Sequence, residues 1–318
     1  VLDADNIEVR NHAVTSEGEG GPEKILKDFH PDIVYMDPAR RGEGGRKVFL
    51  IEDCTPDFLT LKEEIFRFSR HILLKLSPMA DISMVCDRLG GCCREVHVVA
   101  AGGECKELLV WMDREWNEEY SVHAVELHKN GSRALFSFSP SEERIAGQAG
   151  NDRKDAKSIW ADRIGEWVDK ERIADNKAYL FEPGKALMKA GAYYLIAERF
   201  GVHKLGRSIH YYIYSAEGSC GDGLTVEPVT IKKLQEFGKV FRIISCSPLD
   251  KRSLKAAGKA YPHSEVTARN ISTDTDTLRK KAGVTSGDDA HIFGLKSDVC
   301  GNMLLCTKRV FEKDLKTH

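Results

Sequence analysis

The feature that most constrains this chain is a short apolar run that ends abruptly in polar residues. In PDIVYMDPARRG, residues 31–42, apolar side chains from Ile33 to Tyr35 lead to a methionine before the polar residues begin. A short run rich in β-branched residues and bounded by proline indicates a buried strand. The carboxyl end of this expected strand carries Asp37, Pro38, Ala39, Arg40 and Arg41.

Strand-like and helix-like segments alternate around this run. Strands are expected over residues 7–14, 32–37 and 71–76, helices over 23–29, 58–69 and 82–89, and two further strands within 94–113 around a Gly-Gly turn. This alternation predicts a parallel α/β sheet, and the last two strands predict an antiparallel edge on it. Because ligands bind beyond the carboxyl ends of parallel strands, Asp37 and Ser77 are expected to lie side by side if their strands are neighbours.

The second half of the chain follows a different order. A hairpin over residues 122–139 turns at Asn130-Gly131, and the polar stretch 141–177 is interpreted as a connector. Strands are then expected over 178–183, 210–215, 238–246, 264–270, 291–297 and 302–311, and helices over 186–201, 247–260 and 274–284. This order is typical of small α+β modules that resemble a ferredoxin-like fold.

Composition narrows the class of protein. No apolar run approaches the roughly 20 residues that a membrane helix needs, so no membrane partner is expected. The nine cysteines include no C-x-x-C pair, and free thiols at this density fit a reducing cytoplasm. His12, His30 and His71 share no metal-binding spacing, so no metal is assigned.

Charge is spread unevenly along the chain. Residues 203–318 carry 19 Lys and Arg against 13 Asp and Glu, which leaves a net charge of −8 on the remainder. A basic back half indicates a polyanion as partner. The alternative is a solvated surface whose asymmetry arose by chance.

The acid-proline sequence at the strand end has a physical use. Proline fixes its own φ and restricts the residue before it, so the carboxylate of Asp37 and the following carbonyls form a rigid array of acceptors. Such an array can orient an amine for methyl transfer, in which proximity and orientation supply most of the barrier reduction. Arg40 and Arg41 would hold phosphate or carboxylate. The alternative is that the strand simply ends here and that the two arginines are ordinary surface residues.

Two other groups of residues lie near the closing strands. Cys92, Cys93 and Cys105 fall away from Asp37, which favours buried packing over a nucleophile's role. Alternation places Glu104 and Lys106 on one face of their strand and Cys105 and Glu107 on the other. The two acids either belong to a structural ion pair or face the substrate.

The segment DIVYMDPARRG resembles the fourth motif of class I S-adenosylmethionine-dependent methyltransferases. More broadly, nearly the whole chain resembles bacterial RNA methyltransferases with C-terminal ferredoxin-like and THUMP-like domains. Three stretches carry this likeness: GGECKELLVWMD (102–113), YLFEPGKALMKAGAYYLIAERFG (179–201) and SEVTARNISTDTDTLRKKAGVTSGDDAHIFG (264–294).

The resemblance implies a layout of domains. Residues 1–140 would be the C-terminal part of a Rossmann-like methyltransferase domain and 141–177 a connector. A ferredoxin-like domain over 178–246 and a THUMP-like domain over 247–318 would follow.

The resemblance also implies roles for residues. The cofactor would be S-adenosyl-L-methionine, contacted by Asn11, His12 and Asp37. Asp37 would accept a hydrogen bond from the target amine, Pro38 and Ala39 would shape the loop, and Arg40 would hold the substrate backbone or orient Asp37. The substrate would be a nucleobase nitrogen in structured RNA, either tRNA or rRNA.

The sequence departs from this family's pattern at its front. No D-x-x-x-G-x-G precedes Asn6, and neither EGEGG (17–21) nor GEGGRK (42–47) opens a helix as a cofactor loop must. We therefore expect an N-terminally truncated methyltransferase that binds its cofactor poorly. The rival interpretation is a non-catalytic RNA-binding or assembly module with an incomplete methyltransferase sheet.

A second candidate surface is basic and aromatic. Lys185, Lys189, Lys204 and Arg207 surround the end of an expected helix, with Arg41 as a further contact to RNA. Tyr211, Tyr212 and Tyr214 are nearby in sequence and could stack on bases. The alternative is that these tyrosines fill the core of their own module.

Overall fold

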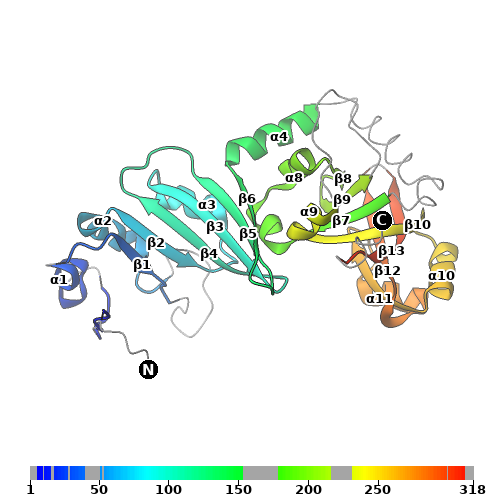
Figure 1. Cartoon of the computed structure of the whole chain (residues 1–318), viewed down its shortest axis with the longest axis horizontal. Helices are drawn as coiled ribbons and strands as arrows, with labels where there is room; N and C mark the ends of the chain where they lie inside the picture. Colours follow the sequence, from blue (N-terminus) through cyan, green and yellow to red (C-terminus); the bar gives the residue numbers. More distant parts are fainter. Residues whose placement is uncertain are drawn as a thin grey trace. The chain divides into compact units, whose positions relative to one another are not determined.

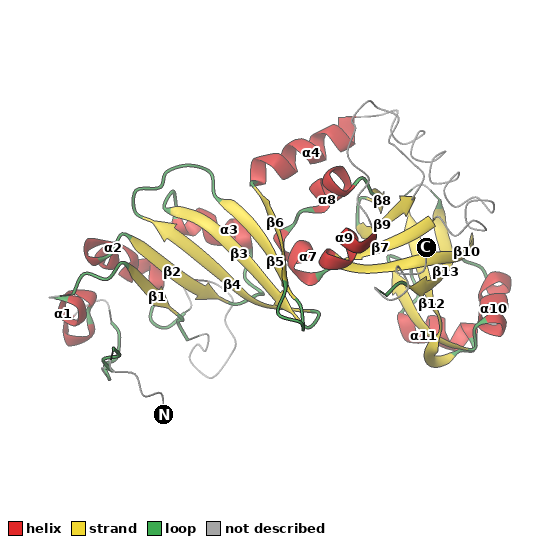
Figure 2. Ribbon diagram, in the orientation of Figure 1, coloured by secondary structure: helices red, strands yellow, loops and turns green. Residues whose placement is uncertain are grey.

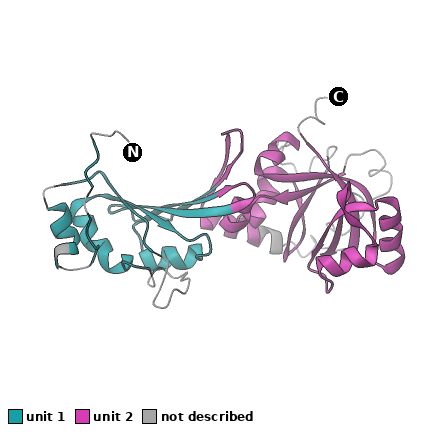
Figure 3. Cartoon of the chain, turned by 90° about the horizontal axis from the view of Figure 1, so that it is seen from below, with its two compact units in different colours: residues 1–99, 105–124 teal, residues 100–104, 125–318 magenta. Residues whose placement is uncertain are grey.

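The computed structural model describes residues 6–9, 11–15, 18–27, 29–39, 51, 54–152, 178–215, 231–298 and 300–311. The chain divides into two compact units, which Figure 3 colours separately: residues 1–99 with 105–124, and residues 100–104 with 125–318. Among the described residues, no helix is both long and apolar enough to cross a membrane. Figure 1 labels the elements of both units.

The first sheet has six strands in the order β1-β2-β4-β3-β5-β6. The strands are β1 (Ile33–Met36), β2 (His71–Leu76), β3 (Cys93–Ala101), β4 (Glu104–Asp113), β5 (Ser121–Leu127) and β6 (Arg133–Phe138). β1 and β2 are parallel, with Met36 beside Leu74, and β2 and β4 are antiparallel, with Leu76 beside Leu108. The expected pair β3–β4 therefore lies inside the sheet rather than at its edge, because β5 and β6 extend the sheet beyond β3.

The helices of the first unit cover one face of this sheet, as Figure 2 shows. They are the 3₁₀ turn η1 (Gly18–Gly20) and the α-helices α1 (Pro22–Leu26), α2 (Phe58–Phe68) and α3 (Ile82–Leu89). Asp57 and Asp81 cap α2 and α3 by accepting backbone N–H groups, which satisfies otherwise unpaired helix-end donors. Leu61 and Ile65 of α2 are buried, and so are the alternate residues of β2.

No described helix covers the opposite face of the sheet, which we call the open face. Ile33 and Tyr35 are 46% and 55% exposed, and Leu73 and Trp111, which pair on β2 and β4, are only half-buried. β1 and β2 are parallel, but β2 and β4 are antiparallel, and antiparallel sheets commonly leave one face uncovered. The described part of the first unit therefore presents a sheet face with apolar side chains that no described helix covers.

Two sequence-based expectations for the first unit are wrong. The strand expected over 7–14 is absent, since its described residues form no regular element and Val9 is 87% exposed. β1 is also not buried, because it lies at the edge of the described sheet, where β2 is its one described neighbour. Both segments have the composition of core strands, but a strand is buried only where neighbours cover its edges and faces.

The second sheet has seven strands in the order β11-β12-β13-β10-β7-β9-β8. The strands are β7 (Ala178–Pro183), β8 (His203–Gly206), β9 (Ile209–Ser215), β10 (Gly238–Pro248), β11 (His263–Arg269), β12 (Thr285–Ser297) and β13 (Gly301–Arg309). β10 pairs with β7 on one side and β13 on the other. The boundary expected at residues 246–247 therefore falls within a strand that joins both halves of the sheet.

The helices of the second unit are α4 (Pro140–Asp152), α7 (Lys185–Ala190), α8 (Tyr193–Phe200), α9 (Ile231–Phe237), α10 (Lys251–Ala260) and α11 (Thr275–Ala282). The single helix expected over 186–201 is broken at Gly191, whose φ of 85° ends α7 and suits glycine. The helix expected over 247–260 begins later than predicted, because Asp250 caps α10 by accepting the Ser253 N–H while Pro248 ends β10. The rest of the expected connector, residues 153–177, lies outside the described residues.

Carboxylates from neighbouring elements cap α7 and α8. The Ala186 N–H donates to Oε1 of Glu126 at 2.8 Å. The N–H groups of Tyr194 and Leu195 donate to Glu143 on α4 at 2.8 and 3.0 Å. A negative charge at a helix N-terminus is favourable, so these acids fix where both helices begin.

The second sheet curls so that its edge strand β8 approaches the end of β12. Ser297 Oγ donates to the carbonyl of Leu205 at 2.8 Å, and Asn270 Nδ2 donates to the carbonyl of Ser208 at 2.7 Å. The curl encloses a core made of strand residues: Ala178, Leu180, Leu205, Ile209, Tyr211, Ile213, Phe241, Ile243, Phe293, Leu295, Met303 and Leu305. A second cluster lies under α10 and α11. The second unit thus has one continuous sheet with a core on each side of β12 and β13.

Candidate functional site

The acid at the end of β1 lies in a small charged group. Asp37 follows Met36, so the parallel pairing of β1 with β2 brings it beside Lys75. Lys75 Nζ is 2.5 Å from Oδ2 of Asp37 and 3.5 Å from Oε2 of Glu107 on β4. Three adjacent strands therefore contribute one cation and two carboxylates to this group. The sequence did not identify Lys75 as a partner of Asp37.

The group is accessible and carries a net negative charge. The side chains of Asp37 and Glu107 are each 39% exposed, and that of Lys75 is 21% exposed. The hydrogen bond to Asp37 raises the pKa of Lys75, and the negative charges of Asp37 and Glu107 add to the effect. Lys75 is thus protonated at neutral pH. Because a carboxylate offers about four lone-pair sites, Asp37 can accept from Lys75 and from a second donor at once.

The loop after Asp37 is held by the backbone. The Ala39 N–H donates to the Thr55 carbonyl at 2.8 Å, and the Thr55 N–H donates back to Ala39 at 3.0 Å. Pro38, between Asp37 and Ala39, is buried. This two-bond bridge, immediately before α2, fixes the direction in which Asp37 leaves the strand. Arg40 and Arg41 lie outside the described residues.

The structure places Ser77 at the same end of the sheet. β1 and β2 are parallel neighbours, as expected, but the residue directly beside Asp37 is Lys75 and Ser77 comes two residues later. Ser77 is 8% exposed, and its Oγ accepts the N–H of Met79 at 3.2 Å. Its hydroxyl therefore shapes the turn before α3.

Asn11 and His12 are the sequence-based candidates for the adenine side of a cofactor site. Both are exposed and lie in no regular element. Among the described residues no contact joins either of them to Asp37, so the described residues do not by themselves form a site for S-adenosylmethionine.

The second candidate surface divides into internal and external residues. Nζ of Lys204 donates to the Arg207 carbonyl at 2.6 Å and lies 5.1 Å from the centre of the Tyr194 ring. Burial lowers the pKa of Lys204. Arg207 is exposed, and its N–H donates to Asp298 Oδ2 at 2.5 Å. Lys204 therefore packs within the module, while Arg207 points outward.

The remaining members of this surface lie on α7. Lys185 is exposed and Lys189, one turn further, is half-buried. The tyrosines of β9 are core residues, as the alternative interpretation held: Tyr211, Tyr212 and Tyr214 are 5%, 0% and 8% exposed. They are not available to stack on bases.

A more strongly basic surface lies on α10. Its four exposed cations are Lys251, Arg252, Lys255 and Lys259, and no acid lies within the helix. Its apolar side, with Leu254 and Ala257, is buried against β11 to β13. Lysines at i, i+4 and i+8 share one helix face. That spacing is visible in the sequence, so sequence reasoning could have found this surface.

Comparisons with known proteins define the second unit. A family model for a ferredoxin-like domain matches residues 179–217. A family model for a THUMP-like domain matches residues 238–308. The second unit carries a ferredoxin-like domain followed by a THUMP-like domain. The two domains share β10 as neighbour of both β7 and β13, and α10 belongs to the THUMP-like domain.

The whole chain also resembles a solved structure. It superposes with a TM-score of 0.68 on the crystal structure of a protein from Porphyromonas gingivalis W83 named as a putative methyltransferase, at 29% sequence identity. The match covers 92% of this chain and 64% of that one. No curated protein matches the chain. These findings confirm the expected resemblance and the mixed α/β class with a C-terminal ferredoxin-like and THUMP-like module.

Proposed function

We propose that this chain is part of a cytoplasmic S-adenosylmethionine-dependent methyltransferase that modifies a nucleobase nitrogen in structured RNA. The observation that supports this most is the position of Asp37. It is an exposed carboxylate at the carboxyl end of β1, in a loop held at Ala39 and Thr55. The similarity to the Porphyromonas protein and the THUMP-like domain support the same class.

In this proposal the residues at the strand end orient the acceptor amine. Asp37 accepts a hydrogen bond from the amine N–H, while Lys75 holds the other side of the carboxylate. Fixing the amine in this way removes rotational freedom before reaction, which is a large part of what enzymes contribute to group transfer. S-adenosylmethionine would supply the methyl group.

The second unit would bind the RNA. The exposed cations of α10, together with Lys185 and Arg207, are suited to phosphate contacts, which dominate the affinity of proteins for nucleic acids. Lys189 and Lys204 would support this surface from its inner side. Phosphate contacts position a nucleic acid without reading its sequence, so the choice of base would be made at Asp37.

The test is methyl transfer by the full-length protein that contains this chain. Asp37→Asn keeps the shape of the side chain but removes its charge. It is expected to lower transfer from labelled S-adenosylmethionine to RNA by about 100-fold or more. RNA affinity, measured by fluorescence anisotropy, should be unchanged because Asp37 lies outside the basic surface.

The matched control is Asp32→Asn, an exposed aspartate just before β1. It should leave methyl transfer and RNA binding at the wild-type level. Full activity in Asp37→Asn would refute the assigned role, and so would a parallel loss of RNA binding.

A second candidate function is RNA binding without catalysis. The four exposed cations of α10 favour it, since they require no cofactor site. The two functions differ in one result: RNA binding alone predicts that the full-length protein binds RNA but transfers no methyl group.

A further inference from the structure

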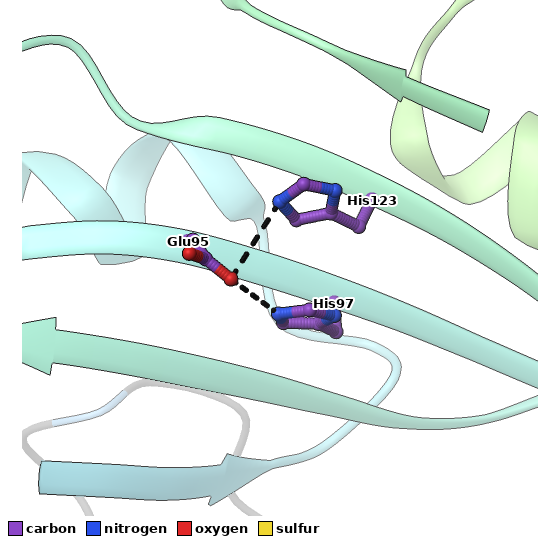
Figure 4. A group of neighbouring side chains, drawn as sticks. All are labelled: Glu95, His97 and His123. Atoms are coloured by element: carbon purple, nitrogen blue, oxygen red, sulfur yellow. Dashed lines mark hydrogen bonds and ion pairs between the residues drawn. The ribbon is translucent and has the colours of Figure 1, made fainter. Parts of the chain in front are cut away.

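Two histidines and a glutamate meet on the open face of the first sheet. Glu95 and His97 lie on β3, and His123 lies on β5, the neighbouring strand. Nε2 of His97 is 3.0 Å from Oε2 of Glu95, and Nε2 of His123 is 3.7 Å from the same oxygen. Figure 4 shows both rings turned toward this one carboxylate oxygen.

The sequence produces this cluster through strand periodicity. Side chains two residues apart on a strand point to the same face, so the E-V-H sequence places Glu95 and His97 together while Val96 is buried on the helical side. The neighbouring strand then contributes His123. This pairing was not visible from the sequence, where the histidines compared for metal spacing were others.

The distances suit a metal ion. The three possible ligand atoms all lie within 4.8 Å of one another. Zinc binds imidazole nitrogen at about 2.0–2.1 Å and carboxylate oxygen at about 2.0–2.2 Å, so two ligands at a tetrahedral angle are about 3.3 Å apart. The observed separations of 3.0 and 3.7 Å lie on either side of this value.

Neighbouring side chains hold the three possible ligands in place. The rings of His97 and His123 stack with centroids 4.6 Å apart. Glu95 directs its other oxygen, Oε1, to within 3.6 Å of Arg94 Nε, which steadies the carboxylate as outer partners of metal ligands do.

We propose that Glu95, His97 and His123 bind a divalent transition metal ion such as Zn²⁺, with water in the remaining coordination position. The two-nitrogen, one-oxygen ligand set favours zinc and its neighbours over Mg²⁺ and Ca²⁺, which prefer oxygen ligands. The side chains are between 18% and 33% exposed, so the ion would be reachable from solvent.

This site is separate from the charged group at Asp37. In the sheet order, β2 and β4 lie between β1 and β3. Three strand steps of about 4.8 Å place β3 about 14 Å from β1. The ion would therefore stabilise the open face or hold a ligand there, and it would not be coordinated by Asp37.

The test uses Co²⁺ as a spectroscopic probe for Zn²⁺. The chain is treated with chelator, titrated with Co²⁺ and followed by its visible absorption, with Zn²⁺ then displacing the cobalt. Cys300→Ser serves as the background, because this exposed thiol could compete. We expect one equivalent to bind with a visible spectrum that lacks the near-ultraviolet band of thiolate ligation.

Variants assign the ligands. His97→Ala, His123→Ala and Glu95→Gln should each weaken binding by at least about tenfold. Zinc should raise the melting temperature of the parent chain and of the control, but not of these three variants. Glu95→Gln preserves shape, so it reports on the ligand even if an alanine variant fails to fold. His30→Ala, an exposed histidine of the same unit, is the matched control. Absence of binding, a thiolate band, or unchanged affinity in Glu95→Gln would overturn the proposal.

Discussion

The two sheets of this protein bury their apolar residues to very different extents. The first sheet has helices on one face, while its other face exposes Ile33 and Tyr35 and carries the charged groups at Asp37 and Glu95. The second sheet curls on itself and encloses Phe241 and Phe293 almost completely. The charged groups of the first sheet therefore lie on the face that no described helix covers. The second sheet encloses its own core and carries the basic helix α10.

This contrast bears on how the two units divide the proposed function. The second sheet has buried clusters on both faces, and one of them includes apolar residues of α10. This packing holds α10 in a fixed position on the ferredoxin-like and THUMP-like unit. The first unit leaves apolar side chains accessible on one face, where a substrate or another segment of protein can pack.

The largest expected effect is a difference between the two sheets in the free energy of unfolding that is lost when an aromatic side chain is removed. Phe293→Ala removes a fully buried ring from the strand core and should cost about 3–5 kcal/mol. Tyr35→Ala removes a ring that is 55% exposed and should cost less than about 1 kcal/mol. Urea unfolding of both variants measures the difference. Equal costs would mean that the open face of the first sheet is covered in solution.

An effect of intermediate size concerns the ion pair that ties β2 to β4 within the first unit. Arg70 Nε and Nη2 donate to the two oxygens of Asp113 at 2.9 and 3.0 Å, and Asp113 is 1% exposed. The hydrogen bonds from Arg70 hold the pKa of Asp113 well below its usual range. This pair therefore stabilises the fold above the unfolded pKa of about 3.9, and the stabilisation is lost as pH falls further.

Asp113→Asn should accordingly cost about 1–3 kcal/mol at neutral pH, a value reduced by the partial exposure of Arg70. The difference from wild type should shrink in urea titrations below about pH 4. Glu115→Gln is the control, because Glu115 pairs with Arg70 from an exposed position. A pH-independent difference would contradict this explanation.

The smallest expected effect concerns RNA binding by the second unit. Replacing Lys251 and Lys255 with glutamine should weaken RNA binding about three- to tenfold and lower the slope of affinity against salt by about one for each lysine. The control pair, Lys232→Gln with Lys296→Gln, removes two exposed charges outside α10. If the control pair weakens binding equally, RNA contacts the unit through its overall charge and α10 has no special role.

Local patterns in the sequence predicted most of the regular elements. The apolar run at 71–76 and the alternation at 264–270 correspond to β2 and β11. These strands were predictable because the burial of each face is reflected directly in the residues of the strand itself. The break at Gly191 and the cap at Asp250 were missed, although glycine and aspartate are the residues that favour those positions.

The errors arose where the structure depends on distant neighbours. Residues 7–14 have the composition of a strand, but no described strand pairs with them. Lys75 lies beside Asp37 because of the register in which β1 and β2 pair. His123 lies beside Glu95 because β5 and β3 are neighbours in the sheet. Register and strand order are set by tertiary packing, so these partners could not be derived from spacing along the chain.

The most direct test of the central claim is nucleoside mass spectrometry of total RNA from cells that lack the gene. The account predicts that one methylated nucleoside disappears, returns with the wild-type gene and does not return with Asp37→Asn. An RNA profile that is identical with and without the gene would contradict it.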